Sequence, residues 1–270
     1  MRNTCSHRRR NPRSRSTFAA SRPYEERGPV MRVWLDAVLA VLLAPTCAAC
    51  HDTLRRPTYG CVCSSCWNSV ITQPAPHCDR CGDCLQPHTR FSSSHCCIRC
   101  ADTTTDVTRL RAIGPYAGAL RDIIHALKYD GRRSLAKPLA ERMRHVGEDL
   151  VLRASVTVPV PLHPARRRER GFNQAADLAR HIGLPVVPAL SRVRATPSQT
   201  TLHAIERRAN VHGAFRATRR VHDLRGVTVL VVDDVRTTGA TLEACARVLK
   251  DAGVREVLAL TAARVESSQP

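Results

Sequence analysis

The chain has 270 residues, 43% of them hydrophobic, which is enough for one large domain or two small ones with a packed core. Disorder over the whole length is therefore excluded. The formal net charge of +19 indicates attraction to polyanions, such as nucleic acid, phosphorylated metabolites or an acidic membrane surface, without choosing among them.

The first 30 residues form a separate basic segment. They hold eight arginines against two glutamates, which leaves a charge of +6, and they show no hydrophobic periodicity. We expect a disordered tail here, with a nucleic-acid-binding arm as the alternative. Met31 begins a more protein-like segment, so the tail could instead reflect an upstream start codon.

The segment 31–50, MRVWLDAVLAVLLAPTCAAC, has the short apolar run and the small residues of a signal peptide. Asp36 interrupts the run, and the apolar stretch is well short of the about 20 residues that cross a bilayer. We therefore expect a helix over 31–46, no membrane span and a cytoplasmic protein. The helix should bury an apolar side against the rest of the chain, formed by Val38, Leu39, Leu42 and Leu43.

Twelve of the thirteen cysteines lie between Cys5 and Cys100, and eight of these form four C-x-x-C pairs. Two thiolates in such a pair can reach one tetrahedral ion from a tight turn, and a second pair 12 or 15 residues further on completes a four-sulfur site. The pattern predicts a double zinc ribbon over 47–100. Its two structural ions would be held by Cys47, Cys50, Cys63, Cys66, Cys78, Cys81, Cys97 and Cys100.

The cysteine pattern is also compatible with other arrangements. Disulfides would suit a small, cysteine-dense region in an oxidising compartment. Sequential pairing of the four units is the simplest arrangement, and an interleaved one is the alternative. Four protein ligands leave no open coordination position, so the metal should be structural. Other registers or substitute ligands are offered by Cys61, Cys84, Cys96, His51, His77, His88 and His95.

The cysteine-rich region ends at a polar linker over 101–107, ADTTTDV, and the chain after it is nearly free of cysteine. The region 108–266 alternates β-branched or apolar runs with segments of helical spacing. This alternation predicts an α/β domain with a parallel sheet flanked by helices. The expected elements are strands at 155–160, 227–232 and 256–264 and helices at 173–183 and 242–253.

The stretch 229–241, VLVVDDVRTTGAT, ends one of these strands with two aspartates and a loop of threonines and one glycine. Ligands of parallel sheets bind at the carboxyl ends of strands, where loops enter helix N-termini. The amides of 237–241 and the threonine hydroxyls would cradle a phosphate, and Gly239 allows close approach. Asp233 and Asp234 would point to opposite sides and suit sugar hydroxyls or a divalent cation. A capped turn with the acidic pair in solvent is the alternative.

No G-x-G-x-x-G and no G-x-x-x-x-G-K-[ST] motif occurs, which sets aside two other nucleotide folds. The stretch resembles the phosphoribosyl pyrophosphate (PRPP) motif of the type I phosphoribosyltransferases. The resemblance implies that Asp233 and Asp234 contact the ribose hydroxyls. It also implies that the 5′-phosphate lies against Thr237, Thr238, Gly239, Ala240 and Thr241.

Three further stretches, with the paired cysteines, resemble the ComF (ComFC) family of competence-associated, phosphoribosyltransferase-like proteins. They are ALKYDGRRSLAKPLAERM, VPVPLHPARRRERGFNQ and RVRATPSQTTLHAIERRANVHGAF. The likeness runs from about Met31 to near the C-terminus. A type I phosphoribosyltransferase-like fold with a small N-terminal zinc-ribbon module is implied.

The same resemblance implies a pyrophosphate-binding loop after the first expected strand, where planar guanidinium donors would come from Arg166, Arg167, Arg168 and Arg170. A solvated arginine face is the alternative, and Asn173 could cap the next helix. Lys128 and Tyr129 match a Lys-Tyr feature of the family. A flexible loop over the ligand would carry Arg194, Thr196, Gln199, Arg207 and Asn210.

Two functions from different classes follow. In the first, the protein binds PRPP with Mg²⁺ and transfers the phosphoribosyl group, while Mg²⁺ and arginines stabilise the departing pyrophosphate. The family resemblance implies a role in DNA uptake, natural transformation or recombination. In the second, the protein is a non-enzymatic, single-stranded-DNA-binding adaptor of a DNA-uptake helicase. The net charge fits both, and the sequence predicts neither the acceptor base nor the oligomeric state.

Overall fold

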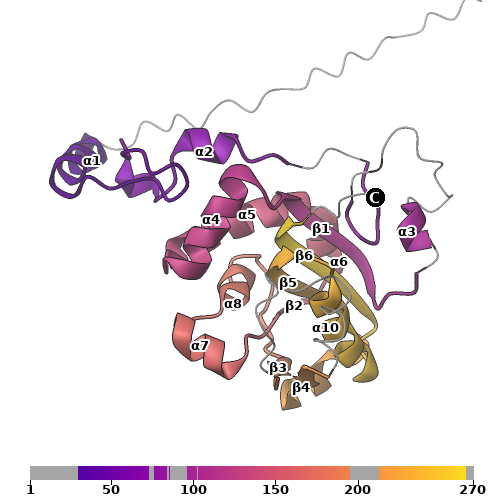
Figure 1. The fold of residues 1–270 in the computed structure, drawn as a ribbon. Coiled ribbons are helices and arrows are strands. Elements are labelled where there is room, and N and C mark those ends of the chain that lie inside the picture. The colour runs from indigo at the N-terminus through magenta and orange to yellow at the C-terminus, as the bar shows by residue number, and fades with distance from the viewer. Residues whose placement is uncertain are drawn as a thin grey trace, which may run out of the picture.

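The computed structural model describes residues 30–72, 76–83, 85, 96–101, 103–194 and 213–265. The basic tail expected over the first 30 residues therefore lies outside the described residues, apart from its last position. Within them, a cysteine-rich N-terminal part precedes a sheet covered by helices (Figure 1).

Four parallel strands form the central sheet in the order β1-β6-β5-β2. This arrangement confirms the expected α/β class, and the three expected strands are β2, β5 and β6. Strand β6 is buried at every position after its first, and β5 is buried over its first five residues, which explains why these stretches are apolar without alternation. The bounds are β1 Val107–Pro115, β2 Val156–Pro159, β5 Thr228–Arg236 and β6 Glu256–Arg264.

Helices cover both faces of the sheet, because alternate strand residues point to opposite sides. Leu230 and Val232 of β5 belong to a core shared with α4, α5, α6 and α8, whereas Val229 and Val231 belong to a core shared with α10. The bounds are α4 Gly118–Tyr129, α5 Ala136–Val146, α6 Glu148–Arg153, α8 Gln174–Ala179 and α10 Ala240–Asp251.

The two helices expected from the sequence are α8 and α10. The second begins two residues before its expected start at 242 and ends before Gly253, which has a positive φ. The first ends at Ala179 rather than at 183, because the chain turns at Arg180, although Ile182 remains in the core.

Smaller elements complete the described part of the chain. A separate two-stranded antiparallel sheet pairs β3 with β4. The remaining bounds are α2 Ser64–Asn68, α3 Ile98–Ala101, α7 Pro164–Arg170, β3 Leu190–Arg192, β4 Phe215–Ala217, and the 3₁₀ turns η1 Pro57–Tyr59, η2 Arg133–Leu135 and η3 Arg219–Leu224.

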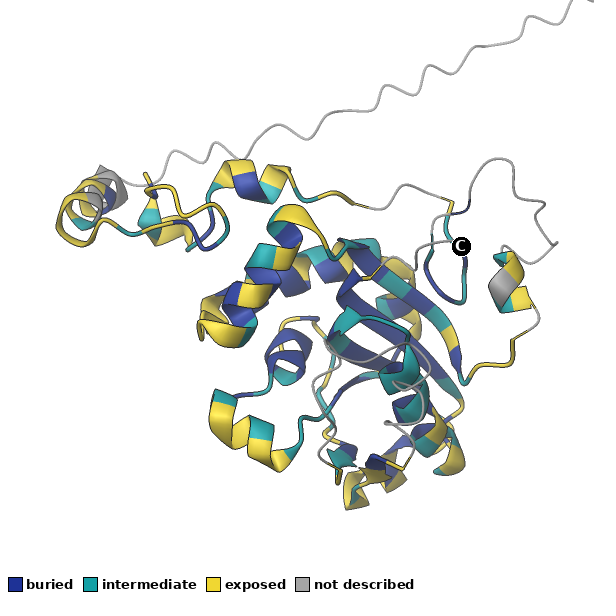
Figure 2. Ribbon diagram, in the orientation of Figure 1, coloured by how far each residue is buried: buried dark blue, intermediate teal, exposed yellow. Residues whose placement is uncertain are grey.

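The helix expected over 31–46 is α1, Val30–Leu43, but its expected burial is wrong. Val38, Leu42 and Leu43 are largely exposed, as Figure 2 shows for most of α1. The buried side chain is instead Asp36, whose Oδ1 accepts a hydrogen bond from the Thr58 amide at 2.8 Å. The inward side of α1 therefore carries a buried carboxylate that is satisfied by a backbone donor of the facing turn.

Among the described residues, no helix combines the length and the hydrophobicity needed to cross a bilayer.

Candidate functional site

The two aspartates of the 229–241 stretch lie near the carboxyl end of β5, which continues past the expected end to Arg236. Asp234 forms an ion pair with Lys128 of α4 on one face of the sheet. Asp233 interacts electrostatically with Arg192 of β3 on the other. The two carboxylates thus point to opposite sides of the strand, as expected from its alternation.

Lys128 partly neutralises Asp234. Its Nζ lies 2.9 Å from Asp234 Oδ1, and both side chains are largely buried. Burial opposes the lysine charge, but the carboxylates of Asp234 and Asp233 outweigh it and raise the pKa of Lys128. Asp234 Oδ2 is also buried, and it has no hydrogen-bond partner among the described residues. This oxygen is therefore suited to a ligand that brings a donor or a positive charge.

Asp233 has a different environment. Its Oδ1 accepts a hydrogen bond from the Asp234 amide at 2.9 Å. Burial and the adjacent Asp234 carboxylate raise the pKa of Asp233 to about 7, against the opposing effect of Lys128 and Arg192. Burial, followed by the nearby charge of Arg166, lowers the pKa of Arg192. Acidic and basic side chains from four elements therefore meet around the end of β5.

The loop after β5 leads directly into α10. Gly239 precedes the helix in the left-handed conformation, with φ at 82°, which glycine adopts at little cost. The Thr238 hydroxyl accepts a long hydrogen bond, 3.4 Å, from the Ala240 amide. Amides in the first turn of a helix have no intrahelical acceptor, and the helix dipole favours an anion there. The loop 237–241 thus runs, through the left-handed Gly239, directly into the first turn of α10.

The RGFNQ sequence builds the corner between α7 and α8. Gly171 ends α7 in the left-handed conformation, and Phe172 is buried. The Asn173 side chain accepts from the Ala175 amide at 3.1 Å, which confirms the expected helix cap. Much of this motif is therefore explained by local structure.

The expected diphosphate arginines are not equivalent. Arg166 is half-buried and lies within electrostatic reach of Arg192. Arg170 donates to Gln174 Oε1 at 2.6 Å and lies over the Tyr129 ring, 5.2 Å from its centre. Arg167 and Arg168 are exposed. The structure thus brings Arg166 near Arg192, which itself interacts with Asp233, while Arg170 already has protein partners.

Residues of the expected flexible loop fall mostly outside the described part of the chain. Arg194 is exposed just after β3. The other four, which lie outside the described residues, are Thr196, Gln199, Arg207 and Asn210.

Three residues near the aspartates were not assigned from the sequence. Arg192 comes from the short strand β3, and Lys128 had no derived role. Tyr116 follows β1, lies within electrostatic reach of Lys128 and Asp234, and has a pKa raised by burial. Their sequence contexts carry no signal of this proximity, because the fold brings together distant parts of the chain.

The paired cysteines form two four-cysteine clusters, in each of which the sulfur atoms lie within 4.8 Å of one another. The pairing is sequential, and all described cysteines are free of disulfides. Cys61, Cys96, His51 and His77 lie outside both clusters. Cys84, His88 and His95 lie outside the described residues. The clusters are Cys47, Cys50, Cys63, Cys66 and Cys78, Cys81, Cys97, Cys100.

Backbone amides point at the clustered sulfurs, as a thiolate site for a metal requires. Cys47 Sγ accepts from the amides of Ala49 and Cys63 at 3.4 and 3.3 Å. The Ser65 hydroxyl lowers the pKa of Cys63 to about 6. Four sulfurs with such donors fit a closed tetrahedral metal site, so both clusters could hold a structural ion.

The first halves of the two clusters are copies of one knuckle, P-x-C-x-x-C-x-D-x-L, at 45–54 and 76–85. In each, the first cysteine amide donates to the carbonyl of the aspartate, Cys47 to Asp52 at 2.8 Å and Cys78 to Asp83 at 2.7 Å. The closing leucine donates to the opening proline at 2.8 and 2.9 Å, respectively. The two metal sites are therefore related by an internal repeat.

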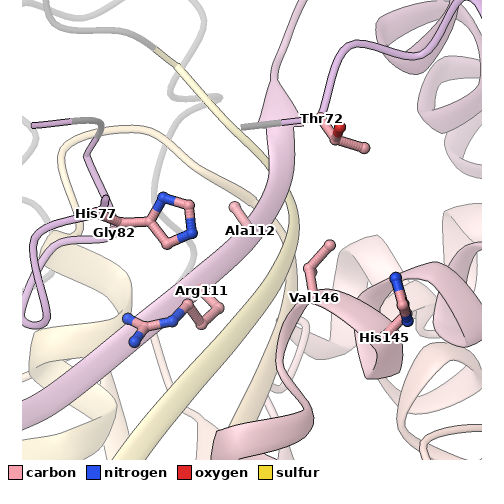
Figure 3. A pocket seen from close by; sticks show the side chains of 7 residues that line it. All are labelled: Thr72, His77, Gly82, Arg111, Ala112, His145 and Val146. Atoms are coloured by element: carbon pink, nitrogen blue, oxygen red, sulfur yellow. The ribbon is translucent and has the colours of Figure 1, made fainter. Parts of the chain in front are cut away.

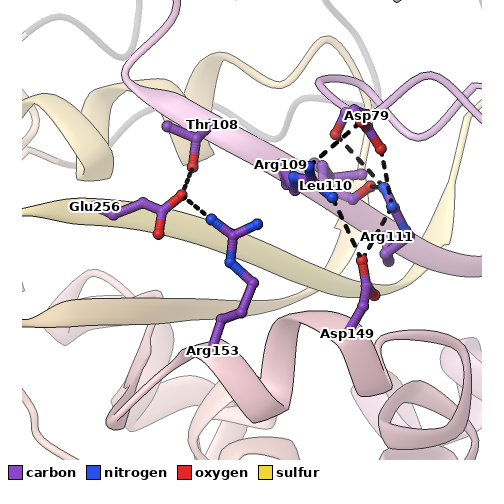
Figure 4. Close-up of polar contacts among 8 residues, drawn as sticks. All are labelled: Asp79, Thr108, Arg109, Leu110, Arg111, Asp149, Arg153 and Glu256. Atoms are coloured by element: carbon purple, nitrogen blue, oxygen red, sulfur yellow. Dashed lines mark hydrogen bonds and ion pairs between the residues drawn. The ribbon is translucent and has the colours of Figure 1, made fainter. Parts of the chain in front are cut away.

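The second knuckle docks on the free edge of β1. The Leu110 amide donates to the Asp79 carbonyl at 3.2 Å, and Arg111 pairs with the Asp79 carboxylate at 3.2 Å (Figure 4). Gly82 has a positive φ, and a Cβ at this position would lie 2.8 Å from the Leu110 carbonyl oxygen. Only glycine allows this approach. The ribbon thereby covers a strand edge that would otherwise expose its backbone groups.

A cavity of about 250 Å³ lies beside this contact, between the knuckle, β1 and α5 (Figure 3). The acidic pair and the loop 237–241 do not line it, so it is separate from the site described above. Its lining residues are Thr72, His77, Gly82, Arg111, Ala112, His145 and Val146.

Comparison with known proteins places this geometry in context. A family model described as "Phosphoribosyl transferase domain" matches residues 168–270. Competence protein F of Haemophilus influenzae is 30% identical over 221 residues, covering 78% of this chain and 93% of that protein. DNA utilization protein YhgH of Escherichia coli is 32% identical over 225 residues, with the same coverages of 78% and 93%.

A further relative matches over a similar span. Competence protein ComFC of Streptococcus pneumoniae is 27% identical over 212 residues, covering 76% of this chain and 88% of that protein. Among solved structures, the "allosteric regulatory enzyme of purine biosynthesis" superposes with a TM-score of 0.31 at 20% identity, over 47% of this chain and 26% of that one.

Proposed function

Because this chain belongs to the ComF family of competence proteins, we propose that it binds PRPP with Mg²⁺ and acts in DNA uptake, natural transformation or recombination. The names of the relatives support the biological process. The match to the phosphoribosyl transferase domain, which includes β5, the loop after it and α10, supports the ligand.

The ligand assignment rests mainly on the hydrogen bonding of the Asp234 carboxylate. Lys128 holds one of its oxygens at 2.9 Å, while the other is buried without a hydrogen-bond partner among the described residues. A buried acceptor without a donor is costly. A ribose hydroxyl or a Mg²⁺ ion would supply what this oxygen lacks.

The other parts of PRPP have matching groups nearby. The 5′-phosphate would lie against the amides and hydroxyls of Thr237, Thr238, Gly239, Ala240 and Thr241, at the N-terminus of α10. We assign the diphosphate first to Arg166, which lies within electrostatic reach of Arg192, as Asp233 does, with Arg168 and Arg170 as further donors. The ligand loop with Arg194, Thr196, Gln199, Arg207 and Asn210 remains a prediction.

A phosphoribosyl transfer at this site would need no protein nucleophile. The acidic pair would orient the ribose, and the arginines would stabilise charge that develops on the leaving pyrophosphate. Mg²⁺, when bound with PRPP, would neutralise part of the diphosphate charge. We further propose that zinc occupies the two four-cysteine clusters and that the protein works in the cytoplasm.

A non-enzymatic role on single-stranded DNA, as an adaptor of a DNA-uptake helicase, is the second candidate. It is favoured by α7, which exposes Arg167 and Arg168 to solvent, where they can contact phosphates.

The ligand assignment is tested by thermal unfolding of the full chain with PRPP, ribose 5-phosphate or pyrophosphate, each with Mg²⁺. A ligand at 100 times its dissociation constant stabilises a protein by about 2.7 kcal/mol. PRPP should raise the melting temperature most, because each fragment reaches only part of the site. An unchanged melting temperature with all three ligands would count against a phosphoribosyl site.

A further inference from the structure

The second knuckle contacts the carboxyl ends of β5 and β6, beside the loop 237–241, which is called the phosphate loop below. Asp83 Oδ1 accepts a hydrogen bond from Arg264 Nη1 at 2.6 Å and another from Arg236 Nη1 at 3.2 Å. Arg236 Nη1 also donates to the Cys81 carbonyl at 3.2 Å. The three charged side chains are between 7% and 16% exposed, so solvent and salt screen these contacts only weakly.

The carboxylate of Asp83 offsets the repulsion between the positive charges of Arg236 and Arg264. Arg236 and Arg264 are register partners at the carboxyl ends of β5 and β6. Two mostly buried guanidinium groups on adjacent strands repel each other unless an acid lies between them. Asp83 supplies this charge from the ribbon, where its carbonyl is held by the Cys78 amide at 2.7 Å.

Arg236 connects this ion-pair cluster to the loop. It is the last residue of β5 and directly precedes 237–241. The loop folds back over it, since a Cβ on Gly239 would lie 3.4 Å from Arg236 Nε. Cys81 and Asp83 are therefore bound to Arg236, whose guanidinium lies beside the turn at Gly239.

The internal repeat shows that this contact is particular to the second knuckle. Asp52 occupies the position of Asp83 in the first knuckle. Asp52 is exposed, and within the described part of the chain it makes no ion pair, whereas Asp83 is mostly buried between two arginines. Of the two equivalent aspartates, only Asp83 therefore forms ion pairs with the sheet domain in the described part of the chain.

We propose that Asp83 is a positioning residue for the phosphate loop, through which the second four-cysteine ribbon fixes the geometry of residues 237–241. The ligand in this inference rests on the proposed function, but the contact between ribbon and loop does not. Metal in the second cluster then supports anion binding, because it holds the knuckle that presents Asp83 to Arg236.

The test compares the full, zinc-loaded chain with the variants Asp83→Asn, Asp83→Glu, Asp52→Asn and Asp79→Asn. Asp52→Asn makes the same change in the other knuckle. Asp79→Asn removes a different arginine-paired acid from the same knuckle. Three quantities are measured for each variant: bound metal per chain, PRPP affinity with Mg²⁺ by calorimetry, and hydrogen exchange of the amides over 237–241.

We expect Asp83→Asn to keep both ions, to weaken PRPP binding by about tenfold or more, and to speed amide exchange in the loop. Asp83→Glu should recover part of both losses because it retains the carboxylate. Asp52→Asn and Asp79→Asn should match the parent in affinity and in loop exchange. Parental affinity and unchanged loop exchange in Asp83→Asn would overturn the inference.

Two further outcomes are separable. If the parent does not bind PRPP, the proposed ligand fails, and loop exchange alone decides whether Asp83 positions the loop. If Asp83→Asn loses metal, Arg236→Gln breaks the same contact without altering the ribbon. Loop exchange as slow as in the parent in that variant would overturn the inference, and faster exchange with both ions retained would support it.

Discussion

At the scale of single residues, the buried ion pair of Lys128 and Asp234 joins α4 to β5. Removing the lysine charge would leave a buried carboxylate uncompensated, which typically costs about 3 kcal/mol or more. We therefore expect Lys128→Met to lower the free energy of unfolding by about 3 kcal/mol, measured by denaturant titration. Lys128→Met with Asp234→Asn should regain most of the loss. A single Lys128→Met variant as stable as the parent would contradict this role.

Asp233 gives the site a pH dependence. Its pKa is raised to about 7 by burial and by the adjacent Asp234, so it becomes protonated as the pH falls below 7. The ionised form attracts Mg²⁺ and accepts stronger, charge-assisted hydrogen bonds from ribose hydroxyls, whereas protonation removes the charge and turns one oxygen into a donor. PRPP affinity should therefore fall by about fivefold between pH 7 and pH 6 and level off above pH 8.

Calorimetric titrations over this pH range test the expectation, with Asp233→Asn as the control. PRPP has its own phosphate protonation, but that effect is common to both proteins. The parent should lose more affinity on acidification than the variant does. Parallel pH profiles for the two would show that Asp233 does not titrate in the binding step.

Several site residues could be predicted because their signals are local. The acidic pair, the loop with Gly239 and the cap by Asn173 each lie within a few positions of the element they act on. Arg192 and the partner of Lys128 could not be predicted, because their contacts join separate strands and helices. Arg170 was predicted to bind the diphosphate because it belongs to a run of arginines. In the structure its guanidinium already donates a hydrogen bond to Gln174, which the local sequence does not indicate.

At the scale of elements, the two ribbons are expected to bind one zinc ion each. Cys63→Ser removes a ligand of the first cluster, whereas Cys61→Ser changes a neighbouring cysteine outside it. Metal analysis of the purified proteins should give about one ion per chain for the first variant and about two for the second and the parent. Loss of an ion from Cys61→Ser alone would show that the ligand set is different.

Elements differ in how far the sequence determines them. The central strands were predictable because burial on both faces makes them continuously apolar. Strand β1 was not predicted, because Arg109 and Arg111 interrupt its pattern, and their charges are met by Asp79 and Asp149 from elsewhere in the chain (Figure 4). The side of α1 that faces inward was predicted wrongly, because the apolar pattern gives no signal of the hydrogen bond that Asp36 accepts from the Thr58 amide.

At the scale of the whole molecule, the charge of +19 has consequences for DNA binding. If the exposed arginines of α7 contact phosphates, Arg167→Ala with Arg168→Ala should weaken single-stranded DNA binding and flatten its salt dependence by about 0.7 in the log–log slope per arginine. Fluorescence anisotropy with a labelled oligonucleotide at several salt concentrations measures this slope.

A matched control replaces another exposed arginine pair, Arg219→Ala with Arg220→Ala on η3. It removes the same charge from a different surface, so it should change the slope much less. Equal slopes in the two double variants would mean that DNA senses only the net charge and that α7 is not a specific contact surface.

The central claim is that the acidic pair and the loop after β5 bind PRPP. Its most direct test is calorimetric titration of the full, metal-loaded chain with PRPP and Mg²⁺, beside the Asp233→Asn/Asp234→Asn double variant. The parent should bind, and the variant should bind about 100-fold more weakly or not at all, because each lost charged acceptor is worth about 1.5 to 3 kcal/mol. No binding by the folded parent, or equal binding by both proteins, would contradict the claim.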